Sequence, residues 1–151
     1  MLYKMTDCYG NTRFKGPILM AKHILVVDDE MSFRFASRLA FRQVGFDVSE
    51  AVDGYEALKL IVSSLDSGNP YDMLLLDIQM PNMTGIELYN ALKELGISIP
   101  VIFISGYADG AMIEDIEKRI NGKLLQKPFE SQQLVRLAES LLNEKGECNG
   151  N

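Results

Sequence analysis

The chain has 151 residues, of which 47% are hydrophobic and 24% are charged, so it fits one globular domain with a sizeable core. Its formal net charge of −6 argues against nucleic-acid binding through a basic face. No apolar run approaches the length of a membrane span and no secretory signal pattern opens the chain, so we expect a cytoplasmic protein without a membrane partner.

The N-terminal residues differ from the rest of the chain. Residues 1–21 carry several basic side chains without a clean hydrophobic period, and we expect a flexible extension there. Two interpretations stay open: Met20 is the physiological start, or the extension is a basic regulatory arm. Residues 22–143 are expected to form the folded domain, followed by a polar tail at 144–151.

From residue 23 onward, short apolar runs alternate with segments of helical period. Strands are predicted at 23–27, 47–51, 73–77, 100–105 and 123–126. Helices are predicted at 32–44, 54–65, 85–95, 111–120 and 131–143. This strict alternation predicts an α/β fold, a doubly wound five-stranded parallel sheet with five flanking helices.

The first predicted helix has a clear core face. Residues at steps of three and four form it: Phe33, Ala36, Ser37, Ala40, Phe41 and Val44. Gly45 follows as the expected C-terminal stop, and Ser131 is the expected N-cap of the last helix. Phe35 and Leu39 fall off the core face, either as isolated exposed residues or as contacts for a signalling partner.

Chemically suggestive side chains stand where the predicted strands end. They come from four strands: Asp28, Asp29 and Glu30 after the first, Asp77 at the end of the third, Ser105 at the end of the fourth, and Lys127 after the fifth. In a doubly wound sheet the carboxyl ends of the strands share one edge, which is where ligands bind. Clustered carboxylates call for a hard cation such as Mg²⁺, and one of them can act as a nucleophile toward phosphorus.

At these positions the chain resembles the response-regulator receiver domains of two-component signalling, a CheY-like, flavodoxin-like fold. Four segments carry the resemblance, in the family's order and at the expected strand ends: ILVVDDE at 24–30, LLDIQMP at 75–81, FISG at 103–106 and QKPF at 126–129. The resemblance covers about residues 22–143 and implies a five-stranded parallel sheet flanked by five helices.

The resemblance also implies a role for each site residue. Asp77 is the phosphoacceptor, Ser105 the switch hydroxyl and Lys127 the partner of a phosphoryl oxygen, and the Lys127–Pro128 bond is expected to be cis. Mg²⁺ would be held by Asp28, Asp29, Asp77 and the backbone carbonyl of Gln79.

The implied function is phosphorelay signal transduction. The phosphoryl donor would be a histidine kinase or a histidine phosphotransfer protein, and the aspartyl phosphate would alter binding of an unknown output partner. We expect a monomer or weak dimer that does not bind nucleic acid directly. We also expect a signalling domain rather than a dedicated enzyme, with at most slow self-phosphorylation from small donors and self-dephosphorylation.

One position departs from the family pattern, and other functions stay open. Leu124 stands where receivers often carry an aromatic residue that follows the switch hydroxyl, so an aromatic flip is not expected there. An aspartate-nucleophile phosphatase would need an Asp-x-Asp spacing that residues 28–30 lack, and a Rossmann-like nucleotide-binding module would need a glycine-rich first loop. A receiver fold used only as a scaffold is the remaining alternative.

Overall fold

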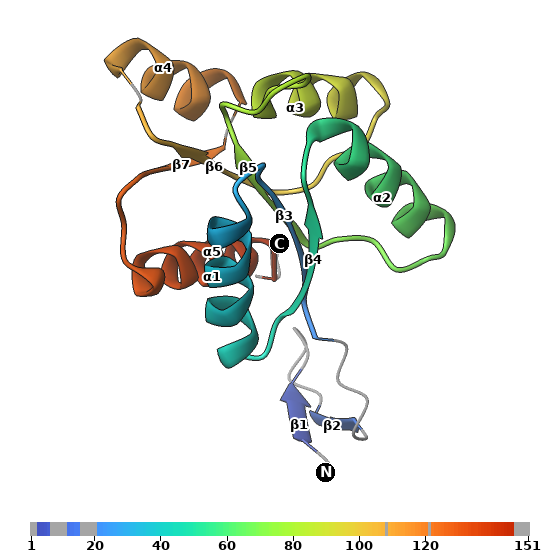
Figure 1. Cartoon of the computed structure of the whole chain (residues 1–151). Helices are drawn as coiled ribbons and strands as arrows, with labels where there is room; N and C mark the ends of the chain where they lie inside the picture. Colours follow the sequence, from blue (N-terminus) through green and yellow to red (C-terminus); the bar gives the residue numbers. More distant parts are fainter. Residues whose placement is uncertain (1–2, 7–11, 16–20, 108, 121, 147–151) are drawn as a thin grey trace.

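A five-stranded, all-parallel sheet forms the centre of the molecule (Figure 1). In the computed structural model its strands are β3 (His23–Val27), β4 (Asp47–Ala51), β5 (Met73–Asp77), β6 (Val101–Ser105) and β7 (Lys123–Gln126). Their spatial order is β4-β3-β5-β6-β7. β4 is added on one side of β3 and the later strands on the other, so the strand order switches between β3 and β5. The predicted sheet is therefore confirmed, with β6 starting one residue later than expected.

The structure describes residues 3–6, 12–15, 21–107, 109–120 and 122–146. Met20 and residues 147–151, which enter the predictions for the chain start and the tail, lie outside these ranges. Two short strands near the N-terminus, β1 (Tyr3–Thr6) and β2 (Thr12–Lys15), pair antiparallel in a sheet of their own. The sequence analysis did not predict this hairpin.

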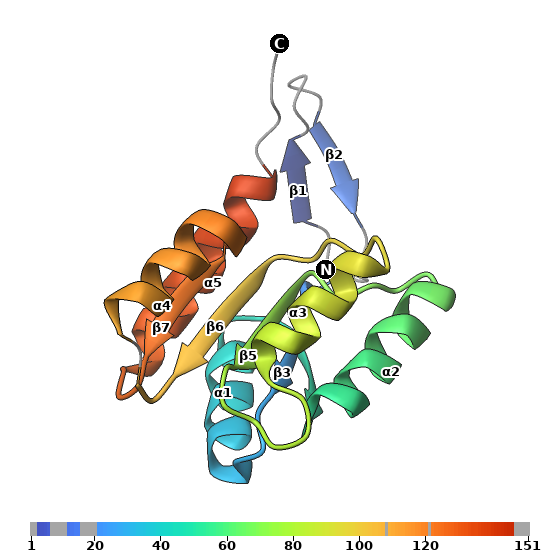
Figure 2. The ribbon, with the colours of Figure 1, turned by 90° about the horizontal axis from the view of Figure 1, so that it is seen from above.

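Helices cover both faces of the sheet. They are α1 (Met31–Gln43), α2 (Gly54–Asp66), α3 (Gly85–Glu94), α4 (Gly110–Asp115) with the π-helical turn η1 (Ile116–Ile120), and α5 (Ser131–Gly146). Helix α1 contacts α5, and α2 contacts α3, which lies beside it in Figure 2. Among the described residues, no helix is long and apolar enough to cross a membrane.

Alternating strand residues build two cores, because successive side chains of a strand point to opposite faces. On one face, Leu25, Leu74 and Phe103 pack with residues of α2, α3 and η1. On the other, Ile24 and Leu75 pack with residues of α1 and α5. Every residue of β5 and β6 is buried, as the continuous apolar runs predicted.

Three local predictions were wrong. Val44 is 48% exposed and lies outside α1, because the chain turns at Gly45, which has a φ of +93°. Ala36 is also exposed, so the buried face of α1 is narrower than predicted. Ser131 is the first residue of α5 rather than its N-cap, and Glu130 precedes the helix. The helix predicted at 111–120 is confirmed as a helical segment, formed by the short α4 and the π-helical turn η1.

Candidate functional site

Three carboxyl groups converge at the edge of the sheet where the parallel strands end. Asp28 and Asp29 follow β3, and Asp77 is the last residue of the adjacent strand β5. One carboxylate oxygen from each lies within 4.8 Å of the others. Asp28 is fully buried, Asp77 is 8% exposed, and Asp29 is exposed to solvent. This grouping follows from topology, because neighbouring parallel strands deliver their C-terminal residues to one edge.

Backbone groups hold the two buried acids in place. The Glu30 N–H donates to Asp28 Oδ1 at 2.8 Å, and the Gln79 N–H donates to Asp77 Oδ1 at 3.0 Å. The Arg34 guanidinium donates to the backbone carbonyl of Asp28 at 2.7 Å. Each acid is thereby fixed by the loop that follows its own strand.

Burial makes ionisation of these acids costly. The pKa of Asp77 is raised from 3.8 to about 6, first by burial and then by the charge of nearby Asp28. Burial also raises the pKa of Asp28, against the lowering effects of the Glu30 N–H bond and of Lys127. A bound cation would stabilise the ionised form of two buried acids that lie this close together.

Lys127 brings a positive charge to the acids. Its backbone N–H donates to the carbonyl of Ser105 at 2.8 Å, which ties the end of β7 to the end of β6. Its Nζ donates to Asp28 Oδ2 at 3.3 Å and lies 3.8 Å from Glu30 Oε2. The Lys127–Pro128 peptide bond is cis, as the resemblance implied. The residue that follows β7, the last strand of the sheet, therefore places an ammonium group among the acids at the ends of β3 and β5.

Ser105 is fully buried at the end of β6 and bonds within its own loop. Its hydroxyl donates to the carbonyl of Tyr107 and accepts from the Tyr107 N–H at 3.1 Å. Tyr107 itself is 69% exposed, and Gln79 is also exposed. The hydroxyl is thus engaged by the β6–α4 loop, on the edge that carries the acids.

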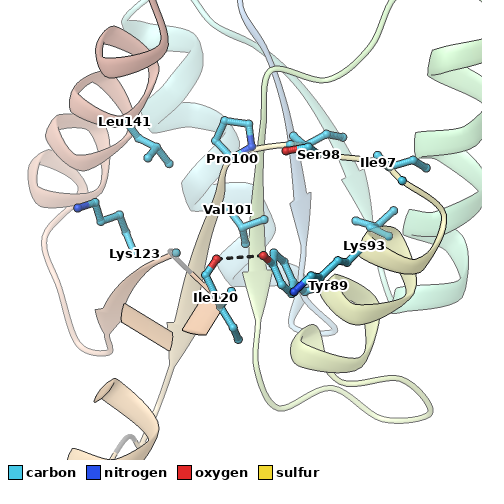
Figure 3. Close-up of a pocket in the computed structure, with 13 residues that line it drawn as sticks. Tyr89, Lys93, Ile97, Ser98, Pro100, Val101, Ile120, Lys123 and Leu141 are labelled. Atoms are coloured by element: carbon cyan, nitrogen blue, oxygen red, sulfur yellow. Dashed lines mark hydrogen bonds between the residues drawn. The ribbon is translucent and has the colours of Figure 1, made fainter. Parts of the chain in front are cut away.

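Leu124, on strand β7, is half-buried in the core. The aromatic residues of that region are Tyr89 of α3 and Phe103 of β6, whose rings meet edge to face at 5.9 Å. The Tyr89 hydroxyl donates to the Ile120 carbonyl at 2.9 Å, which joins α3 to the end of η1 (Figure 3). A cavity of about 590 Å³ surrounds this bond at the start of β6, at the opposite end of the strand from Ser105.

Several contacts of the site were not anticipated. Glu30 was noted only as a neighbour of the acid pair, yet it lies beside Lys127. Phe33 was assigned to the core, but its ring also lies 4.3 Å from Lys127 Nζ. Arg34 was not considered at all. Their position directly after Asp28 and Asp29, at the N-cap and in the first turn of α1, was the available signal.

Other singled-out residues lie apart from the acids. His23 begins β3 at the far end of that strand, where its Nε2 is 2.8 Å from Ser49 Oγ and its ring packs against Tyr71. Phe35 and Leu39 are 51% and 45% exposed on α1, so they are free to contact a partner, as one of the two interpretations requires.

The chain matches the response regulator receiver domain family over residues 24–139. The response regulator receiver protein CpdR of Brucella abortus (strain 2308) is 31% identical over 80% of this chain and 97% of its own length. The chain covers only 52% of the transcriptional regulatory protein TdiR of Thauera aromatica and 13% of the sensor kinase CckA of Brucella abortus (strain 2308), both 31% identical. Receiver domains of this family take phosphoryl groups from histidine kinases.

Solved structures agree with the fold. The receiver domain of the Francisella response regulator 1452 is 31% identical, with a TM-score of 0.70 over 82% of this chain and 98% of that one. A response regulator receiver protein from Burkholderia phymatum is 32% identical, with a TM-score of 0.68 over 81% and 95% of the two chains.

Proposed function

Because the chain belongs to the response regulator receiver domain family, we propose that it is a phosphoacceptor whose Asp77 takes a phosphoryl group from a histidine kinase or histidine phosphotransfer protein. The observation that carries the proposal is the convergence of Asp28, Asp29 and Asp77 within 4.8 Å, with the ammonium of Lys127 beside them. A purely structural role does not explain buried carboxyl groups placed together, because their ionisation is costly.

The reaction is a transfer to a carboxylate oxygen. An oxygen of ionised Asp77 forms a bond to phosphorus while the bond from phosphorus to the donor imidazole nitrogen breaks. The electron pair of the broken bond stays with the imidazole, which takes up a proton. Lys127 pairs with a phosphoryl oxygen, and the Gln79 N–H, 3.0 Å from Asp77 Oδ1, keeps the nucleophilic group oriented.

The residues present fit a divalent cation. Asp28, Asp29 and Asp77 offer only oxygen ligands, which hard cations prefer. Burial first, and then the charge of a neighbouring acid, raises the pKa values of Asp28 and Asp77, and a bound cation would offset both effects. These three residues, together with the Gln79 carbonyl, would hold Mg²⁺. The ion would supply neutralisation of the charge on the phosphoryl oxygens.

The response to phosphorylation begins at Ser105. Its hydroxyl, bonded to the Tyr107 carbonyl in this structure, exchanges that partner for a phosphoryl oxygen on Asp77 and draws the β6–α4 loop with it. The surface of α4 and η1 then presents a different affinity to an output partner. We propose a cytoplasmic signalling domain, monomeric or weakly dimeric, rather than a metabolic enzyme, and a folded unit spanning about residues 22–143.

Phosphoryl uptake tests this function directly. The protein is incubated with a small-molecule phosphodonor and Mg²⁺, and its intact mass is measured beside an Asp77→Asn control. We expect one added phosphoryl group, which is absent in Asp77→Asn and after chelation of the metal. Labelling that persists in Asp77→Asn would contradict the site. Rapid turnover of varied phosphoesters would favour a phosphatase, and no uptake would favour a scaffold.

A further inference from the structure

Phe33 is the least expected neighbour of Lys127. The ammonium has three electron-rich neighbours: Asp28 Oδ2 at 3.3 Å, Glu30 Oε2 at 3.8 Å and the Phe33 ring centroid at 4.3 Å. All three come from the segment that links β3 to the first turn of α1. A cation within about 6 Å of an aromatic centroid is attracted to the ring face.

The ring of Phe33 is held in position by a second aromatic ring. It is half-buried and meets Phe129 edge to face, with centroids 5.9 Å apart and planes at 87°. Phe129 follows Lys127 by two residues, across the cis Lys127–Pro128 bond. The loop that carries the lysine therefore also orients the ring on which its ammonium rests. Phe33 and Lys127 line the same cavity of about 320 Å³ between α1 and the start of α5.

The three neighbours of the ammonium are not equivalent. Asp28 is a proposed metal ligand, so its charge is not reserved for Lys127. Glu30 is 61% exposed at its side chain, and its other oxygen accepts from the Ser32 hydroxyl at 2.8 Å, so its pull on the lysine is screened by water. The Phe33 ring binds neither the metal nor the phosphoryl group. It attracts the ammonium without a full charge that would compete with the phosphoryl oxygens.

We propose that Phe33 is a positioning residue for phosphoryl transfer: its ring face holds the Lys127 ammonium beside the acid cluster and leaves it free to turn to the phosphoryl group. This inference rests on the proposed function of Asp77. Lysine has a long, flexible side chain, so restricting it beforehand reduces the entropy lost when it binds a phosphoryl oxygen. A cation–π contact corresponds to about a two- to thirtyfold change in an equilibrium constant.

The first test compares Phe33→Leu, which removes the ring face, with Phe33→Tyr, which keeps it. Phosphorylation from a small-molecule phosphodonor is measured at saturating Mg²⁺. We expect Phe33→Leu to react about three- to tenfold more slowly and Phe33→Tyr to stay within about twofold of the wild type. Phe46→Leu is the matched control, because Phe46 also packs edge to face on a neighbouring ring, that of Phe41, in the same core.

A double-mutant cycle separates positioning from packing. In the Lys127→Ala background, Phe33→Leu should cause no further loss of rate, because the ring then has no ammonium to hold. An equal slowdown with and without Lys127 would overturn the inference, as would a Phe33→Leu protein that reacts at the wild-type rate.

A second measurement does not depend on phosphorylation. The Phe33 ring current should shift the Lys127 ε-methylene NMR signal upfield in the wild type and in Phe33→Tyr, and this shift should vanish in Phe33→Leu. Its absence from the wild type would overturn the ring contact itself. If the wild type takes up no phosphoryl group, the proposed function fails. If uptake is intact but the rates do not depend on the ring, only the present inference fails.

Discussion

Removing the charge of Asp77 should stabilise the fold. Its pKa rises from an ordinary 3.8 to about 6 on folding, chiefly through burial, so the folded protein retains a proton that the unfolded chain has lost between these pH values. Stability should therefore fall as pH rises through this window. This rise in the pKa of Asp77, from 3.8 to about 6, lowers the free energy of unfolding by about 3 kcal/mol once the group is ionised in both states.

Asp77→Asn is the matched perturbation, because asparagine has nearly the same shape, cannot ionise and can still accept from the Gln79 N–H. We expect its free energy of unfolding at pH 7.5, without divalent metal, to exceed that of the wild type by about 1–3 kcal/mol. Near pH 4 the difference should become small, since Asp77 is then neutral in the folded wild type and is also taking up a proton in the unfolded chain.

Urea unfolding followed by circular dichroism, at pH 4 and 7.5 with a chelator, measures both quantities. Asp66→Asn serves as the control, because Asp66 is exposed at the end of α2. Adding Mg²⁺ at pH 7.5 should stabilise the wild type more than Asp77→Asn, because an ion that binds only the folded state favours it. An Asp77→Asn protein that is less stable than the wild type at pH 7.5, or a difference that does not change with pH, would refute the reasoning.

Two further substitutions probe the supports of the site. Gly85→Ala would place a Cβ 2.4 Å from the carbonyl oxygen of Asp77. We therefore expect it to lower the free energy of unfolding by about 1–3 kcal/mol and to slow phosphoryl uptake. Gly110→Ala is the control, because its Cβ meets nothing within 4 Å, and it should have neither effect. Tyr89→Phe removes the hydrogen bond to the Ile120 carbonyl. We expect the free energy of unfolding in urea to fall by about 1 kcal/mol and amide exchange in η1 to become faster. If neither value changes, this bond does not hold η1.

Most of the fold could be predicted from sequence because its signals are local. Continuous apolar runs marked β5 and β6 within one residue, and strict alternation with helical segments determined a parallel sheet. The meeting of Asp28 with Asp77 followed from topology alone, since adjacent parallel strands end at one edge.

The remaining features depend on contacts between distant segments. The rings of Phe33 and Phe129 come from opposite ends of the domain, so no spacing within α1 could indicate that Phe33 would lie under Lys127. Val44 has the sequence period of the core face, but it lies outside α1 and is exposed because the chain turns at Gly45. The two strands of the β1–β2 hairpin have only four residues each, too few for a clear period, and η1 has the composition of an ordinary helix.

The order of strands in the sheet also gives the site a gradient of local stability. Asp77 ends the middle strand, β5, whose five residues are all buried and whose neighbours pair with it on both sides. Lys127 follows the edge strand β7, none of whose residues is fully buried. Opening free energies are lowest where buried contacts are few, so native-state fluctuations can release the lysine-bearing edge while the backbone of β5 stays closed. Asp77 therefore lies on a strand with few routes to local opening, whereas the residue that approaches it with the opposite charge, Lys127, follows a strand that can rearrange on its own.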